Sequence, residues 1–275
     1  MIIQFDCELV LTYSWSNNNH GICGHTYEVI DYYFLLKNHF TTKILLAEDI
    51  DYYTFKKAIT SKYDLTRAEL DNILDNTIFH NRPKLLRGDR ILFTDGGIEM
   101  INKYNLLFNE VFIFGCGDMN ILDHVDKYQV LLDHRVYGEV GINYVKKVDL
   151  LRMKTLPRFN TKTLLYLTTN CRSIDMDILP DDNYYIISNE PIVGYEVHEP
   201  PVDNIFEQFD KYLYTPISRQ FDCSPRFIAE CAHYNKEVIY MVDYIDPGLQ
   251  ARISDIKEGV VQLEDDDPII NIIRR

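Results

Sequence analysis

The fold is decided by the stretch Phe221-Asp-Cys-Ser-Pro-Arg-Phe-Ile-Ala-Glu-Cys-Ala-His-Tyr-Asn-Lys-Glu-Val-Ile-Tyr240. Its polar start predicts a loop, and Ser224-Pro225 predicts the start of a helix, because serine caps helix ends and proline fits the first turn. The apolar run at residues 238–242 predicts a strand, and another is predicted before the loop at Lys211–Tyr214. The segment therefore forms a strand–helix–strand unit, the repeating element of a parallel sheet.

The same alternation of short apolar runs and helical patterns extends along the chain. It predicts strands at 9–13, 43–46, 77–80, 91–94, 111–114, 130–132, 163–167 and 184–188, and helices at 27–36, 55–63, 68–74 and 202–209. A linker is expected near residues 157–162, after which the alternation restarts. We therefore expect an α/β protein with two Rossmann-like domains, whose parallel sheets face a central cleft.

The expected first domain spans residues 1–157, and the second spans residues 158–267. Residues 268–275 form an apolar tail that either packs back on the first domain or takes part in an oligomer contact.

Charge limits the partners that the protein can bind. The chain has 275 residues and a formal net charge of −14, which disfavours a broad surface for nucleic acid. Two basic segments, residues 82–90 and 146–158, remain as candidates for a local basic cleft.

The cysteines and the apolar runs indicate the class of protein. Six cysteines are scattered without a Cys-x-x-Cys pair, so metal-ligand spacing is absent and reduced thiols in the cytoplasm are expected. The start of the chain lacks the pattern of a signal peptide, and no uncharged run approaches the roughly 20 residues that span a membrane. We expect a soluble protein with no metal, no tightly bound cofactor and no membrane partner.

The predicted helix after Ser224 has the groups of an anion site. Its free amides and positive dipole end suit a phosphate, and Arg226 adds a cation in the first turn. Asp222 lies before the helix and Glu230 eight positions later, so a carboxylate flanks the anion site on either side. Carboxylates hold hydroxyl-rich groups, and a sugar nucleotide has that distribution of parts. A surface helix with ordinary capping fits the same residues.

Arg172 and Ser173 follow the predicted strand at 163–167 and are expected at the same crevice. Arg172 and Arg226 would together neutralise a diphosphate leaving group, whose departure builds negative charge. A solvated loop arginine is the alternative.

In the first half, Asp95 and Gly96 follow a predicted strand. The carboxyl ends of strands line the crevice of a doubly wound sheet, so Asp95 is placed where a general base would deprotonate an acceptor hydroxyl. Gly96 leaves room for the acceptor. An Asp-Gly turn is an equally good interpretation.

The polar loop at residues 14–26 follows the first predicted strand. Gly24 permits close backbone approach at the start of a helix whose amides suit the donor. Trp15 would stack on an acceptor base or sugar, or else anchor the loop. His20 is a candidate for acceptor contact and His25 for catalysis, although a histidine there is more often a simple hydrogen-bonding group.

A family resemblance rests on the second carboxylate. The run Glu230-Cys-Ala-His-Tyr-Asn-Lys-Glu-Val238, with Asp222 before it, resembles the motif of GT-B glycosyltransferases, where Glu-Ala-x-Ala-x-Gly-x-Pro-Val begins at that carboxylate. Asn235 and Glu237 replace the glycine and the proline, and Asp222 stands where many members have glutamate.

The resemblance implies a role for each matching residue. Glu230 would bind the ribose hydroxyls, Asp222 would face the donor sugar, and residues 224–226 would hold the diphosphate. The short run from Ser224 to Cys231 looks like that of glycosyltransferases of large tailed phages, some of which modify hydroxymethylated pyrimidines in DNA. Asp95 then falls near the aspartate base of the phage DNA β-glucosyltransferase, by position and not by motif.

The function expected from the sequence is transfer of a sugar from a nucleotide diphosphate, UDP by preference, to a hydroxyl. The acceptor would be a hydroxymethylated pyrimidine in duplex phage DNA, with a small molecule, a nucleotide or a surface glycan as the alternative. A UDP-sugar epimerase of the same fold and a non-enzymatic nucleotide-sugar-binding protein are rivals from other classes.

Overall fold

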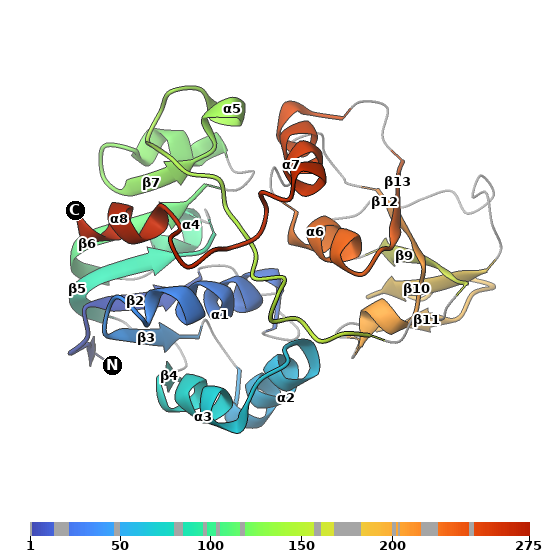
Figure 1. Ribbon diagram of the computed structural model, residues 1–275, viewed down its shortest axis with the longest axis horizontal. Coiled ribbons are helices and arrows are strands. Elements are labelled where there is room, and N and C mark those ends of the chain that lie inside the picture. Colours follow the sequence, from blue (N-terminus) through green and yellow to red (C-terminus); the bar gives the residue numbers. More distant parts are fainter. Residues whose placement is uncertain are drawn as a thin grey trace.

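The computed structural model describes most of the chain. The described residues are 2–13, 22–46, 50–79, 85–95, 98–102, 105–115, 119–156, 161–167, 183–199, 202, 204–215, 225–241 and 245–275. They form two separate parallel β-sheets, which lie side by side in Figure 1. Helix α1 (Gly24–Leu36) packs against β2 and β3 of the first sheet, and α6 (Arg226–His233) lies on the side of the second sheet that faces the first (Figure 1). The expectation of an α/β fold with parallel sheets is confirmed.

The first sheet has eight strands in the order β4-β3-β2-β5-β6-β7-β8, with β1 paired to β5. Their bounds are β1 Ile2–Gln4, β2 Leu9–Thr12, β3 Thr42–Leu45, β4 Thr77–Ile78, β5 Leu85–Phe93, β6 Asn105–Phe114, β7 Gln129–Leu132 and β8 Ile142–Asn143. The connecting helices are α1, α2 Tyr52–Lys62, α3 Arg67–Asp75, α4 Ile98–Ile101, the 3₁₀ helix η1 Met119–His124, and α5 His134–Tyr137.

The second sheet has five strands in the order β11-β10-β9-β12-β13. They are β9 Thr163–Leu167, β10 Tyr184–Ser188, β11 Val197–His198, β12 Lys211–Tyr214 and β13 Glu237–Tyr240, with the 3₁₀ helix η3 Ile205–Glu207, α6 and α7 Pro247–Glu258 among them. The helix expected at 202–209 is wrong apart from η3. Asn204 adopts a left-handed backbone with φ of 52°, which asparagine tolerates and which stops a helix from running through it.

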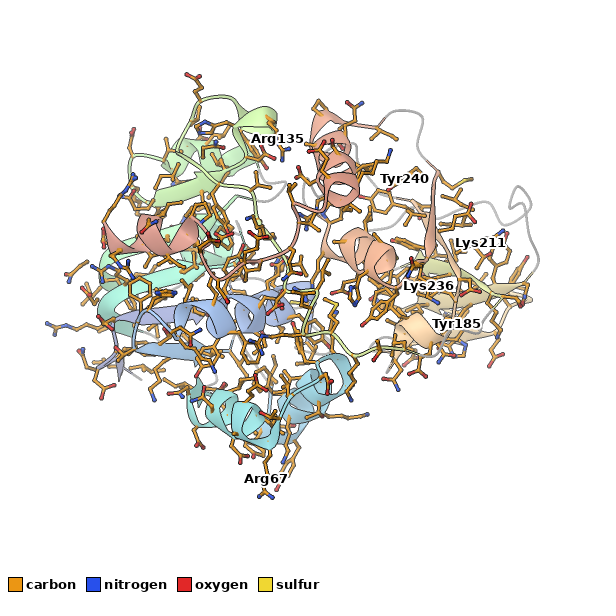
Figure 2. The ribbon with its side chains drawn as sticks, viewed as in Figure 1. Arg67, Arg135, Tyr185, Lys211, Lys236 and Tyr240 are labelled. Carbon is orange, nitrogen blue, oxygen red and sulfur yellow. The ribbon has the colours of Figure 1, made fainter. Side chains whose placement is uncertain are left out.

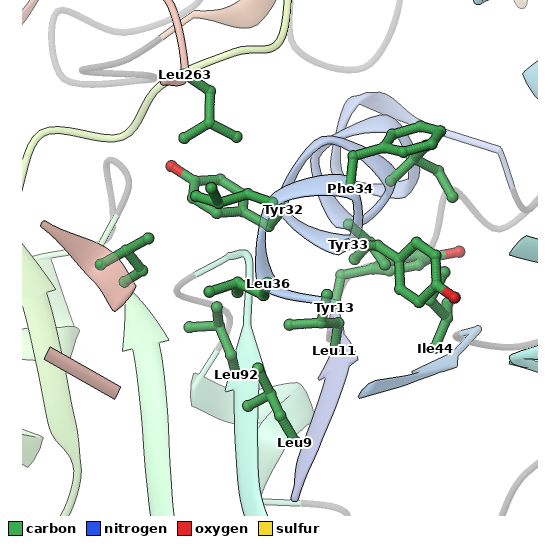
Figure 3. Packing of buried hydrophobic residues seen from close by; sticks show 14 of the residues in the cluster. Leu9, Leu11, Tyr13, Tyr32, Tyr33, Phe34, Leu36, Ile44, Leu92 and Leu263 are labelled. Carbon is green, nitrogen blue, oxygen red and sulfur yellow. The ribbon is translucent and has the colours of Figure 1, made fainter. Parts of the chain in front are cut away.

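The burial of β2 in the core of the first half explains why its sequence is almost entirely apolar. All four residues of β2 are buried, since both faces of a parallel sheet are covered. Figure 3 shows Tyr32 and Leu36 of α1 packed beside Leu9 and Leu11 of β2, and these residues belong to one hydrophobic cluster.

The C-terminal helix α8 (Ile269–Arg274) lies on the first half, although it follows α7 in the chain (Figure 1). Ile269, Ile270 and Ile273 are buried in the same cluster as β2 and α1. Asp267, just before the helix, pairs with Lys147 at 2.9 Å. The end of the chain is therefore part of the core of the first half.

Candidate active site

The carboxyl edges of the two sheets meet at α1 and α6. Each helix follows an inner strand of its sheet, β2 and β12 respectively, so its first turns lie at the carboxyl edge of that sheet. Arg226, the first residue of α6, pairs with Asp31 in the second turn of α1. The contact places both edges at one junction, which is where ligands bind in open α/β sheets.

A histidine lies at the first turn of α1, held by a charge pair. Nδ1 of His25 is 2.8 Å from Oε2 of Glu28, and Oε1 of Glu28 is 2.9 Å from Nζ of Lys146. Glu28 and Lys146 are buried, whereas a quarter of the His25 side chain, 25%, is exposed. The carboxylate of Glu28 therefore bridges a partly accessible imidazole and a buried ammonium group.

Asp95 follows β5 by two residues and is only 2% exposed, and its charge acts on His25. Thr94, its neighbour, donates from Oγ1 to the backbone oxygen of His25 at 3.4 Å. The structure places Asp95 and His25, the two predicted catalytic residues, at one edge of the sheet, because the strands that precede them, β5 and β2, are neighbours.

The charges around His25 control its protonation. Burial alone would lower the pKa of His25, but the carboxylates of Glu28 and Asp95 outweigh it and hold the pKa above its usual value. Burial would raise the pKa of Glu28, but Lys146 and His25 keep it well below its usual range. Glu28 is therefore an anion at every pH near neutrality.

A second group of charges, which we call the junction cluster, joins the two halves. It consists of Asp31, Lys62, Tyr63, Arg226 and Glu230. Arg226 pairs with both Asp31 and Glu230, and Lys62 approaches Oε1 of Glu230 at 2.6 Å. The hydroxyl of Tyr63 donates to Asp31 at 2.8 Å and accepts from Arg226 at 3.1 Å.

The junction cluster includes two of the residues predicted to bind the donor, Arg226 and Glu230. Arg226 and Glu230 are where the helix prediction placed them, but their side chains are 6% and 1% exposed and are engaged in ion pairs with the first half. Because the Glu230 side chain is 1% exposed, its carboxylate is not accessible to ribose hydroxyls in this arrangement. The helix also begins one residue later than expected, with Pro225 at the N-cap.

Burial dominates the titration of Asp31. It raises the pKa of that carboxyl to about 6, although Arg226 acts in the opposite direction. Burial would raise the pKa of Glu230 as well, but Lys62 and Arg226 together keep it below its usual value.

Of the other predicted site residues, only Gly24 lies in the described part of the chain. Gly24 is the first residue of α1, and a Cβ added there would meet nothing within 4 Å. Close packing around its backbone therefore does not require glycine at this position. Seven predicted residues lie outside the described part of the chain: Trp15, His20, Gly96, Arg172, Ser173, Asp222 and Ser224.

Glu28, Asp31 and Lys146 were not predicted from the sequence. Glu28 and Asp31 are three residues apart within a helix that is otherwise largely apolar, and both are buried. That pattern was a usable signal, because an acidic side chain is almost never fully buried unless it is paired. Lys146 gave no such signal, since its partner is distant in the chain.

Several cations of the two basic segments are paired with acidic side chains in the part of the chain that the structure describes. Lys146 pairs with Glu28 and Lys147 with Asp267, and Arg152 pairs with Glu69 and Asp149. In the other segment, Arg90 pairs with Glu110 at 2.8 Å. These cations do not form the exposed basic surface that binding to duplex DNA would require.

A second tie between the halves lies at α5 and α7. Arg135 donates to both carboxylate oxygens of Asp255, at 2.7 and 2.8 Å, and Figure 2 shows it directed toward α7. Arg252 donates from Nη1 to the backbone oxygen of Lys146 at 2.9 Å. Polar contacts thus hold the halves together at more than one place.

Comparisons of the chain with protein-family models, with curated proteins and with solved structures find no match. Within the part of the chain that the structure describes, no helix has the length and apolar character needed to cross a membrane. Among the same residues, no three His, Cys, Asp or Glu side chains are grouped as metal ligands.

Proposed function

We propose that the protein is a glycosyltransferase of the GT-B type, which transfers a sugar from a nucleotide diphosphate to a hydroxyl. The observation that carries the proposal is the placement of Asp95 and His25 at the same carboxyl edge of the first sheet, near the contact between α1 and α6. Such an edge is where open α/β sheets bind ligands, and the pair supplies the proton acceptor that a hydroxyl nucleophile requires.

The reaction would proceed by displacement at the anomeric carbon of the donor. The acceptor oxygen forms a bond to that carbon, its proton passes to Asp95 or His25, and the bond from the carbon to the diphosphate oxygen breaks. The diphosphate leaves with the electron pair. The residues we predict to meet its charge are Arg172, Ser173 and Ser224, with Asp222 facing the sugar.

The internal pairing of the basic segments bears on the acceptor. Since Lys146, Lys147 and Arg152 are neutralised within the protein, an uncharged hydroxyl acceptor, a small molecule or a glycan, is favoured over hydroxymethylated DNA. The class of donor and the class of acceptor are separate parts of the proposal, and a result that contradicts one leaves the other standing.

The test is a thermal-shift screen with UDP-glucose, UDP-galactose, UDP-N-acetylglucosamine and UDP. A ligand at 100 times its dissociation constant stabilises the folded state by about 2.7 kcal/mol. Stabilisation by a UDP-sugar followed by UDP release that depends on an added acceptor supports a transferase. Release of epimerised sugar without an acceptor indicates an epimerase, and no shift with any of these compounds contradicts a UDP-sugar donor.

Transfer assays on duplex DNA with and without 5-hydroxymethylcytosine separate the acceptor classes. We expect little or no transfer to either duplex. Transfer to the hydroxymethylated duplex that falls steeply with salt would instead establish DNA as the acceptor.

A further inference from the structure

We infer that Asp31 and Lys62 of the first half form an autoinhibitory latch on α6. They occupy Arg226 and Glu230, so that a nucleotide diphosphate reaches these two groups only after the latch opens. The inference rests on the proposed transferase function and adds the regulation of its donor site.

Each of the two charged groups of α6 is engaged by the first half. Arg226 and Glu230 are four residues apart, on one face of the helix, and pair with each other. Arg226 also pairs with the carboxylate of Asp31, and its Nη2 donates to the hydroxyl of Tyr63 at 3.1 Å. Nζ of Lys62 lies 2.6 Å from Oε1 and 2.8 Å from Oε2 of Glu230. The first half thus supplies an anion to the arginine and a cation to the carboxylate.

These contacts use the chemistry that a nucleotide diphosphate would use. A carboxylate and a phosphate both pair with a guanidinium group through charge-assisted hydrogen bonds, so a diphosphate competes directly with Asp31 for Arg226. A carboxylate accepts hydrogen bonds from an ammonium group or from hydroxyls, so a ribose competes with Lys62 for Glu230. Each internal contact is therefore the counterpart of a ligand contact.

The character of the interface allows the latch to open. Helices α1, α2 and α5 meet α6 and α7 through charged groups, in the junction cluster and in the pair of Arg135 with Asp255. In the described part of the chain, the hydrophobic cluster around Ala229 of α6 is completed by the connecting segments and α7, and not by α1, α2 or α5. Polar interfaces between parts of a chain permit relative motion. A ligand that supplies the same charges can open the latch without exposing a large apolar surface.

The test is the affinity for pyrophosphate and for UDP, measured by isothermal titration calorimetry at pH 7.5 without an acceptor. At this pH Asp31 is ionised, because its pKa is about 6. A closed latch lowers the apparent affinity by the fraction of protein that is open. We therefore expect Asp31→Asn, which frees Arg226, to bind both ligands at least about tenfold more tightly than the wild type.

Lys62→Met is a second variant, which frees Glu230 and leaves Asp31 in place. Pyrophosphate has no ribose, so this variant should gain more affinity for UDP than for pyrophosphate. Equal affinities of Lys62→Met and the wild type for UDP would overturn the role of Lys62. If Asp31→Asn does not fold, Lys62→Met with UDP decides whether the latch exists.

Two controls separate the latch from a general loosening of the two halves. Asp255→Asn breaks the tie to Arg135 without touching Arg226 or Glu230, and it should leave both affinities unchanged. Asp31→Leu/Arg226→Met removes the cation that Asp31→Asn frees, and it should lose the gain in affinity for pyrophosphate. A gain in Asp255→Asn as large as that in Asp31→Asn would overturn the latch.

The latch is also overturned if Asp31→Asn, folded by circular dichroism, binds both ligands no more tightly than the wild type, or if none of these proteins binds either ligand. A wild type that transfers no sugar would refute the proposed function. Tighter binding of pyrophosphate by Asp31→Asn needs no transfer and would still establish the latch, so the two failures are distinguishable.

Discussion

The junction cluster gives the sharpest stability prediction, through the substitution Asp31→Asn. The change keeps the shape of the side chain and removes one of two buried carboxylates. Lys62 and Arg226 then share Glu230 alone, which leaves one buried positive charge without compensation. Removing one partner of a buried ion pair typically costs about 3–5 kcal/mol.

That magnitude is large against the whole stability of a protein, about 5–15 kcal/mol. At about 2 °C per kcal/mol, the lower value for chains of this size, the melting temperature should fall by roughly 6–10 °C. The assay is thermal and urea unfolding followed by circular dichroism at pH 7.5, where Asp31 is ionised in the wild type because its pKa is about 6.

The protein contains a matched control in the pair Arg67–Asp71. Nε of Arg67 lies 3.6 Å from Oδ2 of Asp71, and the two side chains are 93% and 58% exposed. Asp71→Asn should therefore cost less than about 1 kcal/mol, because solvent screens an exposed pair. Arg67 projects from α3 at the edge of the molecule in Figure 2.

A double-mutant cycle isolates the interaction free energy between Asp31 and Arg226. Asp31→Leu/Arg226→Met removes both charges and should cost clearly less than the sum of its single substitutions, since neither partner is left behind. The reasoning is refuted if Asp31→Asn costs no more than Asp71→Asn, or if the double substitution costs the full sum.

Three further predictions concern other parts of the structure. Gly141→Ala should lower the free energy of unfolding in urea clearly more than Gly138→Ala. Both glycines have positive φ, but only at Gly141 would an added Cβ lie 2.6 Å from a backbone oxygen, that of Val130. Equal effects would contradict the close approach to Val130 as the cause. Ile273→Ala should lower the free energy of unfolding by about 2–5 kcal/mol, because the side chain is fully buried in the core of the first half; an effect below about 0.5 kcal/mol would mean that α8 is not packed there. The pKa of Glu28 is depressed in the folded state, so its contribution to stability is present above the unfolded pKa of about 4.3 and is lost as pH falls through the folded value. Glu28→Gln should therefore flatten the curve of stability against pH on the acidic side. An unchanged acidic slope would count against the pairing of Glu28 with Lys146.

The sequence predicts strands most accurately where they are short runs of mainly apolar residues. Residues 163–167, 184–188 and 211–214 were predicted with the bounds that the structure shows. The first half of β5 was missed, because Arg87, Asp89 and Arg90 interrupt the apolar pattern although the backbone pairs with β1 and β6. Short partners such as β1 and β8 carry too little pattern to be recognised.

The candidate site could be predicted only in part. Asp95 and His25 follow adjacent strands, so topology alone brings them to one edge. Glu28 and Lys146 are distant in the chain, and only the folded structure pairs them. Arg226 and Glu230 show the limit of local reasoning, since four-residue spacing predicts their mutual contact but not the partners Asp31 and Lys62.

The central claim, that the His25 edge of the first sheet performs sugar transfer, is tested most directly by acceptor-dependent release of UDP. The measurement compares the wild type with His25→Gln at a saturating concentration of the UDP-sugar that gives the largest thermal shift. We predict that both proteins bind this donor with equal thermal shifts and that His25→Gln releases UDP at least about 100-fold more slowly. Equal rates of UDP release from the two proteins would contradict the claim.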